Sequence, residues 1–256
     1  INAAMIGGIA ANNASGMCCG IDQNSYKTVS DIRIVLYDGT VLDTSDEESK
    51  KAFREKHSDI IAEIEQLKND VKADSVLTER IKHKFKIKNT TGYSINALVD
   101  YDDPVDIIKH LMIGSEGTLA FISDITYNTV VDEEYKACTL MIYDTIEKAC
   151  DVVPLLKNTP VSAVELLDRE SVRSIEDDPE APEYFRTLPE TACLLLVDIR
   201  GNNEKELTEK ENTVRKAVES IPTLFPFKFT SDPKEYNFNW KARKGLLASI
   251  GGLRKT

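Results

Sequence analysis

The hydrophobic pattern of the chain opens with short apolar runs separated by turn residues. Residues 32–44, IRIVLYDGTVLDT, place an Asp38–Gly39 pair between two apolar-rich runs. Such a pair is the strongest short-range signal for a β-hairpin. The pattern therefore predicts a hairpin here, beside a turn-rich loop over residues 5–20 that contains four glycines.

Helical spacing of apolar residues takes over between residues 45 and 87, where charge density also rises. Ser58 is a suitable N-cap for one helix, and a second helix is expected to start at Asp74 or Ser75. We interpret residues 45–87 as a helical insertion. The side chains expected to face inward are Ile60, Ile61, Ile64, Leu67 and Val71 in the first helix and Val76, Leu77 and Ile81 in the second.

Strand and loop character returns with residues 86–104, KIKNTTGYSINALVDYDDP. Asp103 is then expected to cap, and Pro104 to open, a helix that stops at Gly114. Residues 114–130, GSEGTLAFISDITYNTV, have the pattern of a glycine turn that leads into a strand.

Strands and helices alternate regularly from about residue 136 onward, which predicts an α+β sandwich. The arrangement is ferredoxin-like if its strands form one antiparallel sheet. The pattern places a boundary near residue 132 and so divides the chain into residues 1–132 and 133–256. The expected strands are 136–144, 162–168, 192–201 and a segment near 225–231, and the expected helices are 145–158, 169–176 and 204–220.

Composition narrows the classes of function. Apolar residues make up 41% of the chain and charged residues 29%, which is a globular profile. The net charge of -11 argues against binding to nucleic-acid phosphates. The Lys-rich stretch 82–88 is the local exception, and a solvated helix end is its simpler interpretation. No run approaches the ~20 apolar residues of a membrane span.

Cysteine usage and the first residues add two expectations. The five cysteines include no C-x-x-C pair, so reduced, mostly buried thiols in a cytoplasmic protein fit better than a disulfide framework or a zinc site. The sequence begins INAAMIGG, with no initiator Met and no charged leader before an apolar signal core. This start favours a chain that begins inside a larger protein.

Two glycine-bearing strings are the candidates for chemistry. GGIAANNASG, residues 7–16, offers main-chain amides that could approach a phosphate or a flat ring, and it equally suits a purely structural cluster of turns. It matches neither the P-loop nor the dinucleotide fingerprint. In the second string, GSEGTLAFIS, Glu116 has the ordinary alternative of a solvated turn carboxylate.

The order of the strings is more specific than any one of them. IGGIAANNASG, then VLYDGTVLDT, KNTTGYSINAL and GSEGTLAFISDIT, resembles the FAD-binding domain of the vanillyl-alcohol oxidase superfamily. The whole chain is similar to the branch of D-lactate, glycolate and 2-hydroxyglutarate dehydrogenases, in particular to large members with an iron-sulfur domain in the same polypeptide. The resemblance implies a partial flavin domain of the PCMH type over residues 1–132 and an incomplete substrate-cap domain over 133–256.

The same resemblance implies site residues. Gly92 and Tyr93 match a K-N-x-x-G-Y string that we interpret mainly as packing support. Arg243, in a W-x-x-R string, matches a guanidinium that holds the substrate carboxylate, as the planar fork of Arg is suited to do. Lys255 is a second candidate anion contact, with Arg254 as its competitor. Solvated charges on an amphipathic terminal helix are the alternative. The matched FAD contacts are Gly7, Gly8, Asn13, Ala14, Ser15, Gly16, Gly114, Glu116, Gly117 and Ile122.

The chain departs from the family pattern in three ways. Met17, Cys18 and Cys19 stand where many members carry Arg-containing text, and inert small residues are the simpler interpretation of these thiols. The glycine-rich pyrophosphate loop expected before residue 1 is absent, and so is the H-x-H-x-x-G-N-x-H metal motif. The only histidines, His57, His83 and His110, lie in scattered helical contexts. We therefore assign no metal ligand and no catalytic base.

The implied function is FAD-dependent oxidation of a D-2-hydroxy acid such as D-lactate, glycolate or 2-hydroxyglutarate. In the full-length protein, the resemblance implies that a base removes the hydroxyl proton, hydride passes to the flavin N5, and electrons go to an iron-sulfur cluster outside this chain or to another acceptor. The chain by itself is expected to be inactive. Two alternatives stay open: a non-catalytic structural or interaction module that holds FAD weakly or not at all, and the same flavin fold acting on an alcohol or aldehyde. The expected location is cytoplasmic, and a peripheral membrane association stays open.

Overall fold

The computed structural model describes residues 4–16 and 19–252. Its contacts divide the chain into two compact units, Ile1–Val130 and Val131–Thr256. The division falls close to the boundary near residue 132 that the hydrophobic pattern predicts. Each unit has its own sheet, its own helices and its own buried core.

The sheet of the first unit is antiparallel with the order β2-β1-β3. The predicted hairpin is confirmed, because Val35 pairs with Val41 across a turn in which Gly39 adopts a φ of 82°. Asp38 supports the turn by accepting a hydrogen bond of 2.9 Å from the amide of Thr40. The strands are β1 (Val29–Val35), β2 (Val41–Asp43) and β3 (Phe121–Tyr127).

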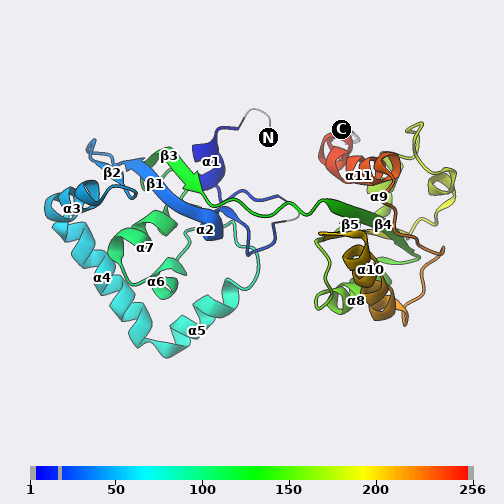
Figure 1. Cartoon of the computed structure of the whole chain (residues 1–256), viewed down its shortest axis with the longest axis horizontal. Coiled ribbons are helices and arrows are strands. Elements are labelled where there is room, and N and C mark those ends of the chain that lie inside the picture. Colours follow the sequence, from blue (N-terminus) through cyan, green and yellow to red (C-terminus); the bar gives the residue numbers. More distant parts are fainter. Residues whose placement is uncertain (1–3, 17–18, 253–256) are drawn as a thin grey trace. The chain divides into compact units, whose positions relative to one another are not determined.

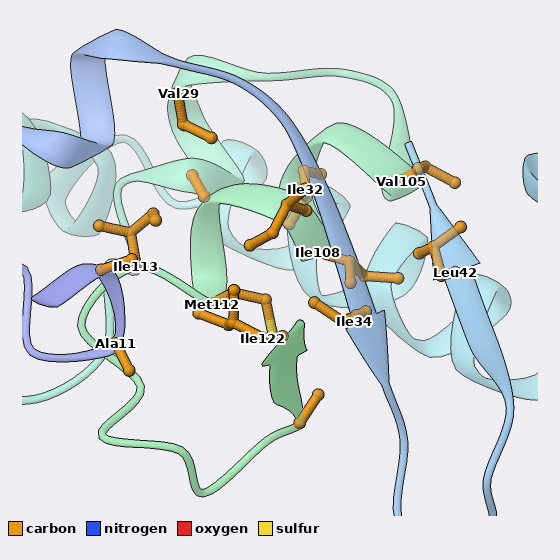
Figure 2. Packing of buried hydrophobic residues seen from close by; sticks show 14 of the residues in the cluster. Ala11, Val29, Ile32, Ile34, Leu42, Val105, Ile108, Met112, Ile113 and Ile122 are labelled. Atoms are coloured by element: carbon orange, nitrogen blue, oxygen red, sulfur yellow. The ribbon is translucent and has the colours of Figure 1, made fainter. Parts of the chain in front are cut away.

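Helix α7 (Pro104–Leu111) packs against this sheet. The predicted cap is confirmed: an Asp103 carboxylate oxygen accepts a hydrogen bond from the amide of Val105 at 2.7 Å. Apolar side chains from the helix and from all three strands interdigitate in one core (Figure 2). The labelled members of that core include Ile32, Ile34, Leu42, Val105, Ile108, Met112, Ile113 and Ile122.

The helical insertion forms an arc of three helices around α6 and α7 (Figure 1). Asp74 caps the last of them, accepting a hydrogen bond from the amide of Leu77 at 2.9 Å. Ser58 is not a cap, since it is the first helical residue and follows His57 at the N-cap position. The three helices of the arc are α3 (Glu47–Lys56), α4 (Ser58–Ala73) and α5 (Ser75–Lys84), and α6 spans Ala97–Asp100.

The apolar face of the insertion is narrower than predicted. Ile81 is buried, and Ile60, Ile61, Ile64 and Val71 pack against the core as expected. In contrast, Leu67, Val76 and Leu77 are exposed, with Val76 at 78%. Among the described helices and strands, α5 packs closely only against α4 and α6. The apolar side chains in its first turn, Val76 and Leu77, are therefore left exposed.

Residues 86–96 contain no strand, although strand character was predicted there. The segment is a loop that leads into α6. Its polar groups bond to the two glycine-bearing segments and not to a neighbouring strand, which explains why a strand-like pattern gives an irregular structure.

His110 is buried in an aromatic environment in the first unit. Its ring stacks on Tyr101 at 3.8 Å between centroids and meets the edge of Tyr26 at 5.0 Å. Nδ1 lies 2.7 Å from the carbonyl oxygen of Asp106, which can only accept a hydrogen bond. Burial, assisted by nearby Lys109, lowers the pKa of His110 to about 4.

This pKa predicts a defined pH dependence of stability. The unfolded chain binds a proton at His110 below pH ~6.5, whereas the folded chain does so only below about 4. The contribution of His110 to the free energy of unfolding is therefore fully present above pH ~6.5. The free energy of unfolding decreases by up to about 3 kcal/mol as the pH drops to ~4. Urea unfolding across this range should show a smaller decrease for His110→Phe, which retains an aromatic ring. An equal decrease in both proteins would exclude His110 as the cause.

The sheet of the second unit is antiparallel with the order β4-β6-β5. The predicted fourth strand is reduced to a single bridge between Cys138 and Thr230. Pro226 lacks an amide hydrogen, which interrupts a regular ladder in that segment. The bridge places the segment beside β4, so the α+β pattern of this unit is confirmed. The strands are β4 (Tyr135–Tyr143), β5 (Ala163–Leu167) and β6 (Cys193–Gly201).

Helices cover both faces of this second sheet (Figure 1). α8 and α10 cover the apolar face, which contains Leu195, Val197 and Ile199. α11 packs on the opposite face against β4 and contacts α9. The helices are α8 (Ile146–Leu156), α9 (Arg169–Arg173), α10 (Glu204–Val218) and α11 (Pro233–Gly252), with a 3-10 turn at Glu183–Thr187.

Two further observations bear on the sequence expectations. Of the described cysteines, Cys138 and Cys193 are buried, Cys19 is partly buried and Cys150 is exposed, and all four are free thiols. Within residues 4–16 and 19–252, no helix combines the length and the apolar character that crossing a membrane requires.

Candidate functional site

The first glycine string is more ordered than the predicted loop. Gly7 and Gly8 lie in a short helix, α1 (Ile6–Ala11), and the turn begins only at Asn12. A Cβ atom at Gly7 would lie 2.8 Å from the carbonyl oxygen of Ile122 on β3, whereas one at Gly8 would meet nothing within 4 Å. Gly7 is therefore required for close packing of α1 on the strand, which the turn propensity of glycine does not reveal.

The turn after α1 is tight. Asn13 has a φ of 50°, a left-handed conformation that Asn tolerates better than most residues. The amide of Asn13 donates to Ala10 and the amide of Ala14 donates to Ile9, both at 2.9 Å. These bonds fold residues 12–14 back over the end of the helix.

The second glycine segment joins the first through main-chain hydrogen bonds. The amide of Gly114 donates to the carbonyl of Ala10 at 3.2 Å, and the amide of Glu116 donates to that of Ala11 at 2.9 Å. The Asn12 side-chain amide also donates to a Glu116 carboxylate oxygen at 2.7 Å. These contacts satisfy carbonyls at the C-terminal end of α1. Two segments about a hundred residues apart in sequence thus form one continuous surface.

Positive φ angles shape the second segment. Gly114, Glu116 and Gly117 have φ values of 90°, 53° and 74°. Glycine adopts such angles without strain, whereas Glu116 does so at a cost that its bonds to α1 offset. Glu116 is exposed, as expected for a solvated turn carboxylate. Its carboxylate also accepts a hydrogen bond from the Asn12 side chain.

A third segment, residues 88–94, completes the cluster. The Ser94 hydroxyl donates to the carbonyl of Ile113 at 2.6 Å, and the Asn13 side-chain amide donates to the carbonyl of Asn89 at 3.3 Å. Tyr93 lies 2.9 Å, oxygen to oxygen, from the hydroxyl of Thr118. The resemblance implied that Gly92 and Tyr93 mainly support packing. The contacts of their segment reach both glycine segments.

Buried polar atoms at this junction lack partners. Asn13 Oδ1, Ser15 Oγ and Ser115 Oγ have no hydrogen bond to any residue that the structure describes. Asn13 is 7% exposed and Ser115 is 1% exposed. Because an unsatisfied buried polar atom costs about 1–3 kcal/mol, the arrangement fits a ligand that offers polar groups here. At Gly16 and Gly117, an added Cβ would meet no atom of the described residues within 4 Å.

Ile122 differs from the other matched residues. Its side chain is 7% exposed and lies in the core of the first unit (Figure 2). On β3 it pairs with Ile34, and its carbonyl faces Gly7. Ile122 therefore packs in the core beneath α1, and its side chain does not face a ligand.

Arg243 lies on α11 in the second unit. Its Nε donates a hydrogen bond of 2.7 Å to a carboxylate oxygen of Glu165 on β5. The two side chains are 27% and 17% exposed. Sequence reasoning did not identify Glu165, because its partner is 78 residues away in the chain. Arg254 and Lys255, like Met17 and Cys18, lie outside the described residues.

Sequence reasoning also missed a buried polar row under α11. Asp198, in an otherwise apolar strand, is fully buried and accepts a hydrogen bond from the Tyr236 hydroxyl at 3.0 Å. Burial raises the pKa of Asp198. The Asn239 side-chain amide lies 3.5 Å from Cys138 Sγ, and burial raises the pKa of this thiol to about 12. Cys138 is therefore protonated near neutral pH and unreactive.

The described residues contain no group of three or more His, Cys, Asp or Glu side chains placed to hold a metal ion. Cys19 is held locally, with its thiol 3.0 Å from the carbonyl of Gly16. His57 and His83 lie in the helical insertion, and His110, four residues before Gly114, is buried and bonded to its own helix. Among the described residues, the geometry identifies no catalytic base.

Residues 133–256 match the family described as "FAD linked oxidases, C-terminal domain". The chain is 24% identical to a D-2-hydroxyglutarate dehydrogenase of Haemophilus influenzae, over 99% of this chain and 26% of that protein. It is also 24% identical to "D-lactate dehydrogenase (cytochrome) 1, mitochondrial" of Saccharomyces cerevisiae, over 96% of this chain and 33% of that protein.

A structural comparison agrees with these matches at the level of the fold. A solved structure of alkyldihydroxyacetonephosphate synthase is similar with a TM-score of 0.53 and 13% identity, over 92% of this chain and 36% of that one. The chain spans about a quarter to a third of the length of the two relatives named above. The second unit thus matches the C-terminal domain of FAD-linked oxidases over residues 133–256, and nearly all of the chain aligns with the two dehydrogenases named above.

Proposed function

We propose that this chain supplies part of the flavin site and part of the substrate site of an FAD-dependent D-2-hydroxy-acid dehydrogenase. The observation that carries the proposal is the junction of the two glycine segments, with three buried polar atoms that lack partners among the described residues. The match of residues 133–256 to FAD-linked oxidases supports FAD as the group that this junction would hold, and the relatives named as D-2-hydroxyglutarate and D-lactate dehydrogenases support the substrate class.

The residues of the junction would hold the cofactor mainly through the main chain. Gly8, Ala14, Gly16, Gly114 and Gly117 would keep bulky side chains away, Gly7 lets α1 pack closely on β3, and Asn13, Ser15, Glu116 and Ser115 would offer polar groups. FAD held by these residues would supply the hydride acceptor for oxidation of the substrate carbon. The part of this chain is to orient the cofactor and to exclude water from its face.

Arg243 would bind the substrate carboxylate. A guanidinium pairs with two carboxylate oxygens at once, which suits an acid better than an alcohol or an aldehyde. Lys255 is proposed as a second contact with the anion, and Arg254 is its competitor. Electrons would leave to an iron-sulfur cluster outside this chain or to another acceptor. Free thiols at four described cysteines suit a reducing compartment such as the cytoplasm.

Substrate profiling tests the proposal. The full-length, flavin-loaded protein, with an artificial electron acceptor, should oxidise D-lactate, glycolate or D-2-hydroxyglutarate and leave the L-enantiomers and simple alcohols unchanged. Oxidation of an alcohol or aldehyde without oxidation of any hydroxy acid would support the alternative substrate class. A full-length, flavin-loaded protein that oxidises none of these compounds would contradict the proposal.

A further inference from the structure

Strand register places Glu165 on the face of the second sheet that lies opposite α8 and α10. Its pairing partner on β6 is Leu196, and Leu196 also pairs with Leu140 on β4. Neighbouring side chains on a strand point to opposite faces, and Val164 packs against the core beneath α8 and α10. Glu165 therefore points to the face that α11 covers.

α11 presents one stripe of polar side chains to that face. Tyr236 bonds to Asp198 on β6, Asn239 lies against Cys138 on β4, and Arg243 bonds to Glu165 on β5. Positions 236, 239 and 243 recur at helical spacing, so they share one side of the helix. The three contacts reach each of the three strands and fix the helix, and with it Arg243, on the sheet.

The bond to Glu165 uses one edge of the guanidinium. Nε donates at 2.7 Å, and this is the only hydrogen bond that the Arg243 side chain makes to another described residue. An Arg guanidinium has five N–H donors in a rigid plane. With Nε engaged, Nη1 and Nη2 form a pre-oriented pair of donors that matches the two oxygens of a carboxylate.

We propose that Glu165 is a positioning residue, which holds Arg243 by Nε so that Nη1 and Nη2 face the carboxylate of the substrate. This inference rests on the proposed function, in which Arg243 binds that carboxylate. It assigns to Glu165 an orienting role, distinct from that of a charge that merely neutralises Arg243. A positioning acceptor needs the correct reach, whereas a neutralising charge needs only its sign.

Two substitutions separate these roles. Glu165→Gln keeps the length and an acceptor oxygen but removes the charge, so it should bind an anion with an affinity close to that of the wild type. Glu165→Asp keeps the charge but is one methylene too short to hold Nε, so it should weaken binding about tenfold, as expected for loss of a charge-assisted hydrogen bond. A purely neutralising role predicts the reverse: tighter binding in Glu165→Gln and no change in Glu165→Asp.

The measurement is calorimetric titration with oxalate, a dicarboxylate that requires no turnover. Asp178→Asn is the matched control, because Asp178 pairs at 2.8 Å with Lys241, which lies on α11 as Arg243 does. The affinity of this variant for oxalate should not change. Thermal melting verifies that each variant is folded, and the isosteric Gln variant is expected to fold even if the Asp variant does not.

The outcomes are decisive for Glu165. Weaker binding in Glu165→Asp with near-wild-type binding in Glu165→Gln supports the positioning role. Equal affinity in all variants, the reverse order, or no oxalate binding by the wild type overturns it. If the wild type binds oxalate but the flavin-loaded protein oxidises no D-2-hydroxy acid, the proposed function fails, and the positioning role is still judged by the two variants.

Discussion

Gly7→Ala should destabilise the first unit by about 2 kcal/mol and lower its flavin content, since forced overpacking costs about 1–3 kcal/mol. The new Cβ would lie 2.8 Å from the carbonyl oxygen of Ile122, which belongs to a paired strand and has little freedom to move. Either α1 or β3 must shift. Because Gly114 and Glu116 bond to the C-terminal end of α1, a shift of this helix would open the junction proposed to hold FAD.

The adjacent glycine provides the control. Gly8→Ala adds the same methyl group to the same helix, but nothing lies within 4 Å of its Cβ position. Alanine favours helix over glycine by about 1 kcal/mol, so the stability of this variant should be unchanged or slightly higher. Urea unfolding and the bound-flavin absorbance of the purified variants make the comparison. Equal stability in the two variants would show that the close packing of Gly7 on β3 has no energetic consequence.

In the full-length protein, Arg243→Ala should raise the KM for D-2-hydroxy acids about a hundredfold, because two charge-assisted hydrogen bonds together contribute roughly 3 kcal/mol. The substitution also leaves Glu165 without the partner that it contacts at 2.7 Å. An uncompensated carboxylate would then repel the substrate anion. Flavin content should remain normal, since the glycine junction belongs to the other unit and does not depend on this side chain.

Arg243→Lys distinguishes the fork from the charge. Lysine keeps the positive charge but loses the planar pair of donors, so its KM should lie between that of the wild type and that of Arg243→Ala. Initial rates with an artificial electron acceptor provide the values. A KM for Arg243→Ala equal to that of the wild type would remove Arg243 from the substrate site.

Local signals in the sequence predicted the elements whose structure depends on local chemistry. The hairpin turn needs a side-chain acceptor and a residue with positive φ within four residues. Asp38 supplies the acceptor and Gly39 supplies the positive φ. Asp103 caps α7 for the same reason. The two glycine strings also meet as the resemblance implies, since the amide of Glu116 bonds to Ala11.

Features that depend on distant partners were not predictable in the same way. Gly7 was assigned to a loop because glycine is common in turns, but its role is set by Ile122, more than a hundred residues later. Leu67 and Val76 were expected inside because periodicity identifies an apolar stripe without showing what covers it. Glu165 was not identified because only the folding of α11 onto β5 brings it to Arg243.

The two glycine segments are proposed to form one continuous surface against FAD. Amide hydrogen exchange with and without FAD tests this directly, with FAD in excess because the isolated chain is expected to bind it weakly. Bound FAD should slow exchange in residues 7–16 and 114–117 together, and in residues 88–94 that bridge them. Unchanged exchange in both glycine segments at saturating FAD, or slowing only elsewhere in the chain, would contradict it.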